Sequence, residues 1–229
     1  MRDILLIPGF MCTSVLWGDM RAALEGVGRL HYCDLTEGTS IPDYAGRILR
    51  DAPPHFLVLG FSMGGYVARE IAVHAADRVG GLILINSSAR GTTPAEQALN
   101  LQRVELAQRA KFTGLSRDAI ERVLAPSRRK DAEMVARIRS MSGSLGKDVF
   151  IRQLGIVRED GLEECGRIHC PTLVIASEDD QLRLPEESSE MAAAIPGATL
   201  KVLSDCGHMA PLEAPDRLSE IVVPWLAAR

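Results

Sequence analysis

Six short runs of apolar residues divide the chain, and helix-forming segments lie between most of them. The runs span residues 4–7, 30–33, 56–59, 82–85, 172–176 and 199–203. Each run is apolar throughout or nearly so, which is typical of strands that are covered on both faces. Helical patterns occupy residues 15–24, 42–50, 64–76, 186–194 and 215–228. Alternating strands and helices predict an α/β fold with a mostly parallel, six-stranded, doubly wound sheet.

The alternation stops after the fourth run. Residues 87–166 contain only helical patterns, at residues 94–110, 116–124, 130–142 and 147–159. Thr93, Ser116 and Ser127 are expected to cap helices, because their hydroxyl oxygens can accept N–H groups at a helix start. We therefore predict a core formed by residues 1–86 and 167–229, with an all-helical lid at residues 87–166 inserted after the fourth strand.

The composition is that of an ordinary globular domain. The 229 residues are 46% hydrophobic and 24% charged, and a chain of this length can bury a substantial core. A net charge of −4 argues against a nucleic-acid partner. The chain lacks an apolar run long enough to span a membrane, and its N-terminus does not resemble a signal peptide. We expect the partner to be a small molecule.

The five cysteines indicate a cytoplasmic protein with free thiols, because their number is odd and no CxxC pair occurs. Cys165 and Cys170 flank His169, but no second pair of ligands accompanies them, so a zinc site is not expected there. We expect neither a metal nor an organic cofactor.

The third apolar run leads directly into Gly60-Phe61-Ser62-Met63-Gly64, and a helical pattern follows at once. A strand, a sharp turn and a helix in this order expose a serine hydroxyl at the end of a sheet. Gly60 and Gly64 suit such a turn, because strand and helix pass too closely there for side chains. The five-residue pattern is weak evidence by itself, but in this context it makes Ser62 the candidate nucleophile.

A serine hydroxyl needs a base to take its proton, and the base needs an acid to orient it. Of the five histidines, His208 alone follows the end of a predicted strand, at the sheet edge that would carry Ser62. The acid is expected after the fifth strand, where Glu178, Asp179 and Asp180 compete and Asp180 is favoured. The chain order serine, acid, histidine is characteristic of one serine-hydrolase fold.

Backbone N–H groups are needed to stabilise negative charge on a reacting carbonyl oxygen. One expected donor is the N–H of Met63, which follows the nucleophile. The other is the N–H of Phe10 in the loop after the first strand, where Gly9 gives the backbone freedom. Cys12 lies in the same loop, but no base is implied beside it, so we expect a packing role.

With these residues in view, the chain resembles the α/β-hydrolase superfamily over nearly its whole length, and its lidded esterase and enol-lactonase members in particular. The similar segments are an oxyanion loop at 8–10, a nucleophile elbow at 60–65, an acid turn at 177–185 and a histidine loop at 207–215. The resemblance implies a minimal α/β-hydrolase fold in which Ser62, Asp180 and His208 hydrolyse a small carboxylic ester, lactone or thioester.

Two departures from the family pattern stand out. Pro8 occupies a position where the family often has histidine, which leaves the substrate preference of the loop open. The family also often begins with a hairpin, whereas this chain starts at the following strand. One sheet edge is then expected to be exposed, and we expect a monomer or a homodimer.

Two other functions remain alternatives. Related lidded hydrolases use the same triad on C–C bonds or enol-lactones of aromatic catabolism, and Arg90, Arg103 and Arg109 could hold a substrate carboxylate, although arginines at helical spacing are usually exposed. A ligand receptor on the same fold is the less favoured alternative.

With aromatic residues at only 4%, an aliphatic acyl pocket is expected. Some apolar residues of the lid are expected to pack against the core and others to line this pocket, and the sequence does not sort them: Leu99, Leu101, Val104, Leu106, Phe112, Leu115, Met134, Met141 and Phe150.

Overall fold

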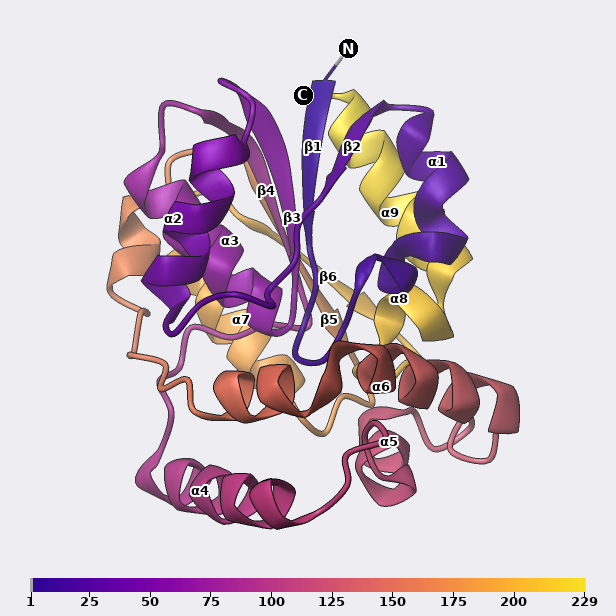
Figure 1. The fold of residues 1–229 in the computed structure, drawn as a ribbon. Helices are drawn as coiled ribbons and strands as arrows, with labels where there is room; N and C mark the ends of the chain where they lie inside the picture. The colour runs from indigo at the N-terminus through magenta and orange to yellow at the C-terminus, as the bar shows by residue number, and fades with distance from the viewer. Residues whose placement is uncertain (1) are drawn as a thin grey trace.

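The structure, a computed structural model, describes residues 2–229 and contains a parallel sheet between two layers of helices (Figure 1). The strands are β1 (Arg2–Ile7), β2 (Gly28–Tyr32), β3 (Phe56–Phe61), β4 (Val79–Ile85), β5 (Thr172–Ser177) and β6 (Thr199–Leu203). They lie in the order β2-β1-β3-β4-β5-β6, and every neighbouring pair is parallel. The predicted α/β fold and all six predicted strands are confirmed.

Helices cover both faces of the sheet (Figure 1). One face carries α2 (Ile41–Asp51), α3 (Met63–His74) and α7 (Pro185–Ala194), and the other carries η1 (Ser14–Met20), α1 (Arg21–Glu25), α8 (Ala210–Glu213) and α9 (Pro215–Ala227). Side chains alternate between the faces along each strand. In β1, Ile4 and Leu6 join the core beneath α9, while Leu5 and Ile7 join the core beneath α3. Both faces are apolar, which explains the continuous apolar runs.

Three helices, α4 (Pro94–Arg109), α5 (Arg117–Val123) and α6 (Ala132–Leu154), lie between β4 and β5 in the chain. They cross the carboxyl ends of the strands, at the bottom of Figure 1. Thr93 and Ser116 cap α4 and α5 as predicted, each accepting a backbone N–H with its hydroxyl oxygen. No helix within residues 2–229 is long and apolar enough to cross a bilayer.

The two helices predicted at 130–142 and 147–159 are present, and they meet at a kink within α6. The backbone leaves helical geometry at Gly146 (φ 80°, ψ 174°), and the second helix ends at Leu154 rather than at residue 159. Gly146 tolerates the left-handed backbone that joins the two parts without a loop.

The predicted N-cap at Ser127 is wrong. Asp131 caps α6 by accepting the Met134 N–H at 3.0 Å, and Ser127 donates its hydroxyl to Asp205 in the loop after β6. The Ser127 hydroxyl forms this contact instead of a helix cap, because the fold places Asp205 beside it despite their distance in sequence.

Candidate active site

Ser62 lies where the chain turns from β3 into α3. Its backbone has φ 51° and ψ −116°, a left-handed conformation that is uncommon for a residue with a side chain. The Ser62 N–H donates to the Ile85 carbonyl at 2.9 Å. The Ser62 carbonyl accepts the Gly65 N–H and the Ser87 hydroxyl, both at 2.9 Å. These bonds hold the strained backbone turn at Ser62.

Two glycines make this turn possible. A Cβ atom on Gly60 would lie 2.4 Å from the Gly64 carbonyl oxygen, and one on Gly64 would lie 2.4 Å from the carbonyl oxygens of Ile7 and Pro8. Because the obstructing atoms belong to the backbone, no side-chain rotation could relieve the overlap. The expectation that glycine is required at both positions is therefore confirmed.

His208 lies in the loop after β6, and its imidazole reaches Ser62. The Nε2 atom is 2.8 Å from Ser62 Oγ, in position to accept the hydroxyl proton. The His208 backbone N–H donates to the Val123 carbonyl at 2.8 Å, and the ring packs against Phe61 with centroids 5.1 Å apart. Ser62 and His208 are only 6% and 3% exposed, and a hydrogen bond is stronger where water is excluded.

Asp180 lies in the loop after β5 and completes a chain of hydrogen bonds. Its Oδ2 atom accepts the His208 Nδ1 proton at 2.7 Å. Its Oδ1 atom accepts the backbone N–H groups of Leu182 and Arg183 at 2.8 and 2.9 Å. The carboxylate is 2% exposed, so these bonds compensate for its burial. Asp180 thus holds the imidazole in one orientation.

The structure brings Asp180, rather than its two neighbours, to the histidine. Glu178 is exposed and Asp179 is half-buried, and neither side chain contacts His208. Asp205 lies in a turn with φ 42°, where its side chain accepts the Ser127 hydroxyl. The arrangement Ser62–His208–Asp180 can therefore activate a hydroxyl group for nucleophilic attack.

Asn86 anchors the histidine loop from the end of β4. Its buried side-chain amide donates to Ser177 Oγ at 2.9 Å and to the carbonyls of Gly207 and His208 at 3.2 and 2.8 Å. Three acceptors fix the amide orientation, because the reversed amide would point its oxygen at three other oxygens. Asn86 is absent from the predicted site, although its place at the end of a predicted strand is a signal that could have identified it.

Glu213 anchors the same loop from its other side. Its buried carboxylate accepts the N–H groups of Ala125, Gly207 and Met209 at 2.7, 3.2 and 2.9 Å. Burial raises the pKa of this carboxyl, and the three N–H donors oppose that effect. Because Ala125 follows α5, this carboxylate also joins the helical segment to the histidine loop.

The expected oxyanion donors lie next to the nucleophile. Met63 is the first residue of α3, so its N–H has no acceptor within the helix. A Cβ atom on Gly9 would lie 3.1 Å from the Ser62 Cβ, which places the loop carrying Phe10 directly against Ser62. Neither the Phe10 nor the Met63 N–H has a hydrogen-bond acceptor within residues 2–229. Both groups are thus available to an oxygen atom bound beside Ser62.

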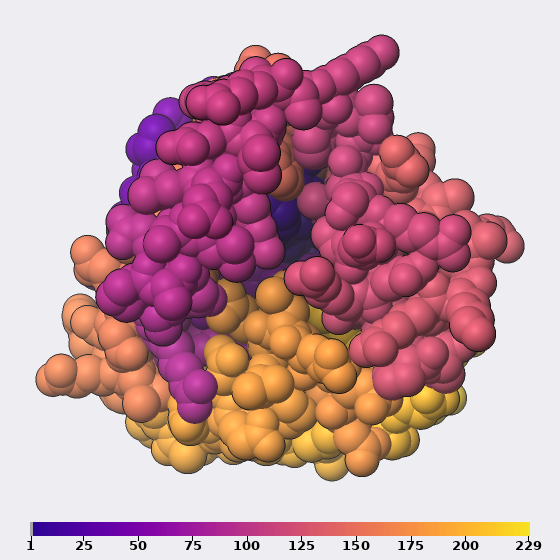
Figure 2. All heavy atoms as spheres, turned by 90° about the horizontal axis from the view of Figure 1, so that it is seen from below, coloured from indigo at the N-terminus to yellow at the C-terminus, as the bar shows by residue number. Residues whose placement is uncertain are grey.

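The helical segment leaves an opening above this loop. Figure 2 views the molecule from the side of the helical segment. A hollow lies between the magenta part of the chain, which includes α4, and the pink part, which includes α5. The indigo N-terminal segment forms the floor of this hollow. Phe10 packs against Phe150 with ring centroids 5.7 Å apart, and Phe150 packs against Phe112 at 4.8 Å. Phe112 and Phe150, two of the apolar residues considered for the lid, thus form an aromatic cluster with Phe10.

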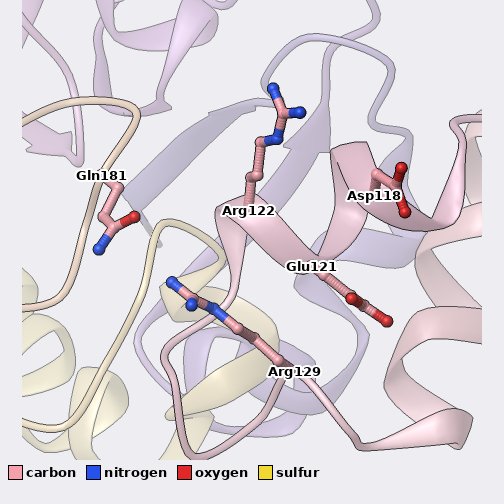
Figure 3. A pocket seen from close by; sticks show the side chains of 5 residues that line it. All are labelled: Asp118, Glu121, Arg122, Arg129 and Gln181. Carbon is pink, nitrogen blue, oxygen red and sulfur yellow. The ribbon is translucent and has the colours of Figure 1, made fainter.

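Arg90, Arg103 and Arg109, the arginines considered as carboxylate ligands, lie at the surface, as is usual for arginines at helical spacing. Arg90 forms a bidentate ion pair with Glu190 at 2.8 and 2.6 Å, and Arg103 and Arg109 are exposed on α4. A separate, solvent-facing cavity of about 290 Å³ lies between α5 and the loop after β5. Its lining is charged or polar and does not include Ser62 (Figure 3). The lining residues are Asp118, Glu121, Arg122, Arg129 and Gln181.

All five cysteines are free thiols. Burial raises the pKa of the Cys12 thiol to about 12, so this thiol remains protonated beside the oxyanion loop. Among residues 2–229, no group of three or more His, Cys, Asp or Glu side chains is arranged to hold a metal ion.

Comparisons with known proteins identify related sequences. A family model described as the alpha/beta hydrolase family matches residues 4–221. A pimeloyl-[acyl-carrier protein] methyl ester esterase of Nitrosospira multiformis is 26% identical over 96% of this chain and 93% of its own. The enzyme of the same name from Serratia marcescens is 27% identical over 99% of this chain and 94% of its own.

Solved structures share the fold. A thermophilic esterase from Thermogutta terrifontis superposes with a TM-score of 0.88 at 26% identity, covering 100% of this chain and 90% of the esterase. An enol-lactonase from Burkholderia xenovorans superposes with a TM-score of 0.85 at 24% identity, covering 98% of this chain and 91% of the enol-lactonase.

Proposed function

The chain belongs to the alpha/beta hydrolase family, and we propose that it is a serine hydrolase that cleaves a small carboxylic ester through an acyl-enzyme on Ser62. The observation that carries this proposal is the unbroken chain of hydrogen bonds from Ser62 Oγ to His208 Nε2 at 2.8 Å and from His208 Nδ1 to Asp180 Oδ2 at 2.7 Å. In our proposal these three side chains are the catalytic triad.

Acylation begins when His208 Nε2 takes the Ser62 proton and Ser62 Oγ attacks the carbonyl carbon. Asp180 stabilises the imidazolium that forms. The C–O bond to the alcohol then breaks, and His208 donates its proton to the departing oxygen. In the second half of the cycle, His208 takes a proton from water, the hydroxide attacks the acyl carbon, and Ser62 leaves with a proton from His208. The products are a carboxylic acid and an alcohol.

The N–H groups of Phe10 and Met63 form the proposed oxyanion hole. Both lack an acceptor within the described chain and lie beside Ser62. Each such donor is worth about 3–4 kcal/mol of transition-state stabilisation. Fixed donors are effective because they need no reorganisation as negative charge develops on the carbonyl oxygen.

The substrate that we favour is an oxygen ester of an acyl chain. Support comes from the two methyl ester esterases, which match this chain over nearly its full length. We further propose that residues 87–166 act as a lid that sets substrate size, because α4–α6 cross the strand ends that carry Ser62, Asp180 and His208 (Figure 1). The rings of Phe10, Phe112 and Phe150 would then contact one side of the bound substrate.

A cytoplasmic setting is proposed on the five free thiols. The proposed partner is the small-molecule substrate, without a metal or an organic cofactor, because the triad chemistry needs only water as co-reactant.

Kinetics with short p-nitrophenyl esters test the proposal. We expect Ser62→Ala and His208→Ala each to abolish hydrolysis, while thermal unfolding shows that both variants remain folded. Substrate profiling with enol-lactones and dienoates, compared with simple esters, separates ester hydrolysis from the alternative reactions. Most of the activity remaining in either alanine variant would refute the assignment.

A further inference from the structure

We propose that Gln153, near the end of α6, is a positioning residue that fixes the Phe10 N–H as an oxyanion donor. This inference rests on the proposed function, because it concerns the same active site. It assigns the helical segment a second task besides covering the site, namely holding part of the catalytic machinery in place.

The Gln153 amide is buried between two loops. Its Oε1 atom accepts the Met11 N–H at 2.8 Å, and its Nε2 atom donates to the Leu35 carbonyl at 2.9 Å. The residue is only 4% exposed. Because one end of the amide faces a donor and the other an acceptor, its orientation is determined, and it bridges the loop after β1 and the loop after β2.

The loop that Gln153 contacts is a tight turn. The Gly9 carbonyl accepts the Cys12 N–H at 3.1 Å, which leaves Phe10 and Met11 at the centre of the turn. A peptide group is planar and trans, so fixing the Gly9 carbonyl also fixes the opposite direction of the Phe10 N–H. The orientation of this oxyanion donor therefore depends on the integrity of the turn.

The turn contains a strained residue. Met11 has φ 52° at the second central position, where a positive φ normally selects glycine or asparagine. Such a conformation persists only when surrounding contacts maintain it. The contacts hold both ends of the peptide between Phe10 and Met11. Gln153 accepts its N–H at 2.8 Å, and Cys12 Sγ donates to its carbonyl oxygen at 3.4 Å.

A second contact connects the same part of α6 to the turn. Phe150 precedes Gln153 by three residues, which places both on one face of the helix. Phe150 packs against Phe10, the residue that carries the donor, with ring centroids 5.7 Å apart. Both residues follow Gly146, so the part of α6 beyond this break forms the contact with the oxyanion loop.

The neighbouring residue provides a matched control. Arg152 donates to the Thr36 carbonyl, one residue beyond the carbonyl bound by Gln153, and does not contact the turn at residues 9–12. Arg152→Met therefore loosens the attachment of α6 to the loop after β2 without removing a contact to the oxyanion loop. If a looser attachment of α6 is enough to lower activity, Arg152→Met will lose activity as well.

The test compares Gln153→Met and Gln153→Asn with wild type and Arg152→Met. Methionine removes the acceptor, and asparagine withdraws it by one methylene. We expect Gln153→Met to lower kcat about 10- to 100-fold with KM changed less than about threefold, because part of one oxyanion donor is lost. Gln153→Asn should lose less, and Arg152→Met should keep kcat within about threefold of wild type.

The affinity for n-butylboronic acid separates the two possible roles of Gln153. It would not change if Gln153 only stabilised the fold. This probe forms a tetrahedral adduct with an active serine, so its affinity should fall in parallel with kcat/KM in Gln153→Met and remain in Arg152→Met. A folded Gln153→Met with wild-type kcat and boronate affinity overturns the inference. If that variant fails to fold, wild-type kcat in Gln153→Asn overturns it equally. A wild-type protein that hydrolyses no ester refutes the proposed function instead.

Discussion

Replacing Asn86 with alanine should weaken the support of the catalytic histidine and lower the stability of the whole protein. The Asn86 amide donates three hydrogen bonds, two of them to the carbonyls of Gly207 and His208. These bonds join the end of β4 to the histidine loop. Their loss leaves buried carbonyl oxygens without their donor, and the loop gains freedom to move His208 away from Ser62.

The expected loss can be estimated from the structure. Each buried hydrogen bond contributes about 1 kcal/mol net, and the two N–H groups of the amide, shared among three acceptors, contribute about 2–3 kcal/mol together. Asn86 also has φ 45°, where alanine is disfavoured by about 1 kcal/mol. Asn86→Ala should therefore lower the free energy of unfolding by about 3–4 kcal/mol, which corresponds to a drop in Tm of about 10 °C.

Two further variants separate these contributions. Asn86→Gly removes the hydrogen bonds but accepts the positive φ, so it should be more stable than Asn86→Ala by about 1 kcal/mol. Asn100→Ala on α4 is the matched control, because alanine is a better helix former than asparagine and should change stability little.

Urea unfolding followed by far-UV circular dichroism measures these differences, and ester hydrolysis measures kcat. We expect kcat to fall in both Asn86 variants and to remain unchanged in Asn100→Ala. A free energy of unfolding within about 0.5 kcal/mol of wild type for Asn86→Ala would show that the amide network does not hold the loop.

Three further predictions concern the elbow, the thiols and the Glu213 carboxylate. Gly64→Ala should abolish folding or activity, because its Cβ would lie 2.4 Å from two carbonyl oxygens. Gly46→Ala is the control and should raise Tm slightly, because the space around Gly46 is open and alanine favours a helix. Differential scanning calorimetry measures the Tm of both variants, and ester hydrolysis measures their activity. Burial raises the pKa of Cys12 to about 12, so iodoacetamide should label this thiol slowly at pH 8 in the native protein and rapidly after denaturation, as peptide mass spectrometry can show. Glu213→Ala leaves three buried N–H groups unsatisfied and should lower the free energy of unfolding by about 3 kcal/mol in urea titrations; an unchanged value would contradict the assigned contacts.

The six strands could be predicted because each is a short apolar run whose alternate residues face two buried layers, as Leu5 and Leu6 do in β1. The positions of Ser62, Asp180 and His208 followed from topology, because parallel strands place their carboxyl ends at one sheet edge. The sequence favours Asp180 over Asp179, and the folded loop shows the Asp180 carboxylate at the imidazole.

The supporting contacts could not be predicted, because they join residues far apart in the chain. In the sequence, Gln153 is only one of several polar residues in a predicted helix. Its partners Met11 and Leu35 lie more than a hundred positions away. Ser127 reads as a helix cap, yet its hydroxyl bonds to Asp205 in the folded protein. Such contacts depend on how the helical segment packs against the core, which local patterns do not determine.

Trapping of the acyl-enzyme tests the central claim most directly. The protein is mixed with a short p-nitrophenyl ester, quenched with acid within the first turnovers, and examined by intact and peptide mass spectrometry. We predict one added acyl group on the peptide that carries Ser62, and no adduct in Ser62→Ala. Ester turnover that persists in Ser62→Ala, or an acyl group on another residue of the active wild-type protein, would contradict the account.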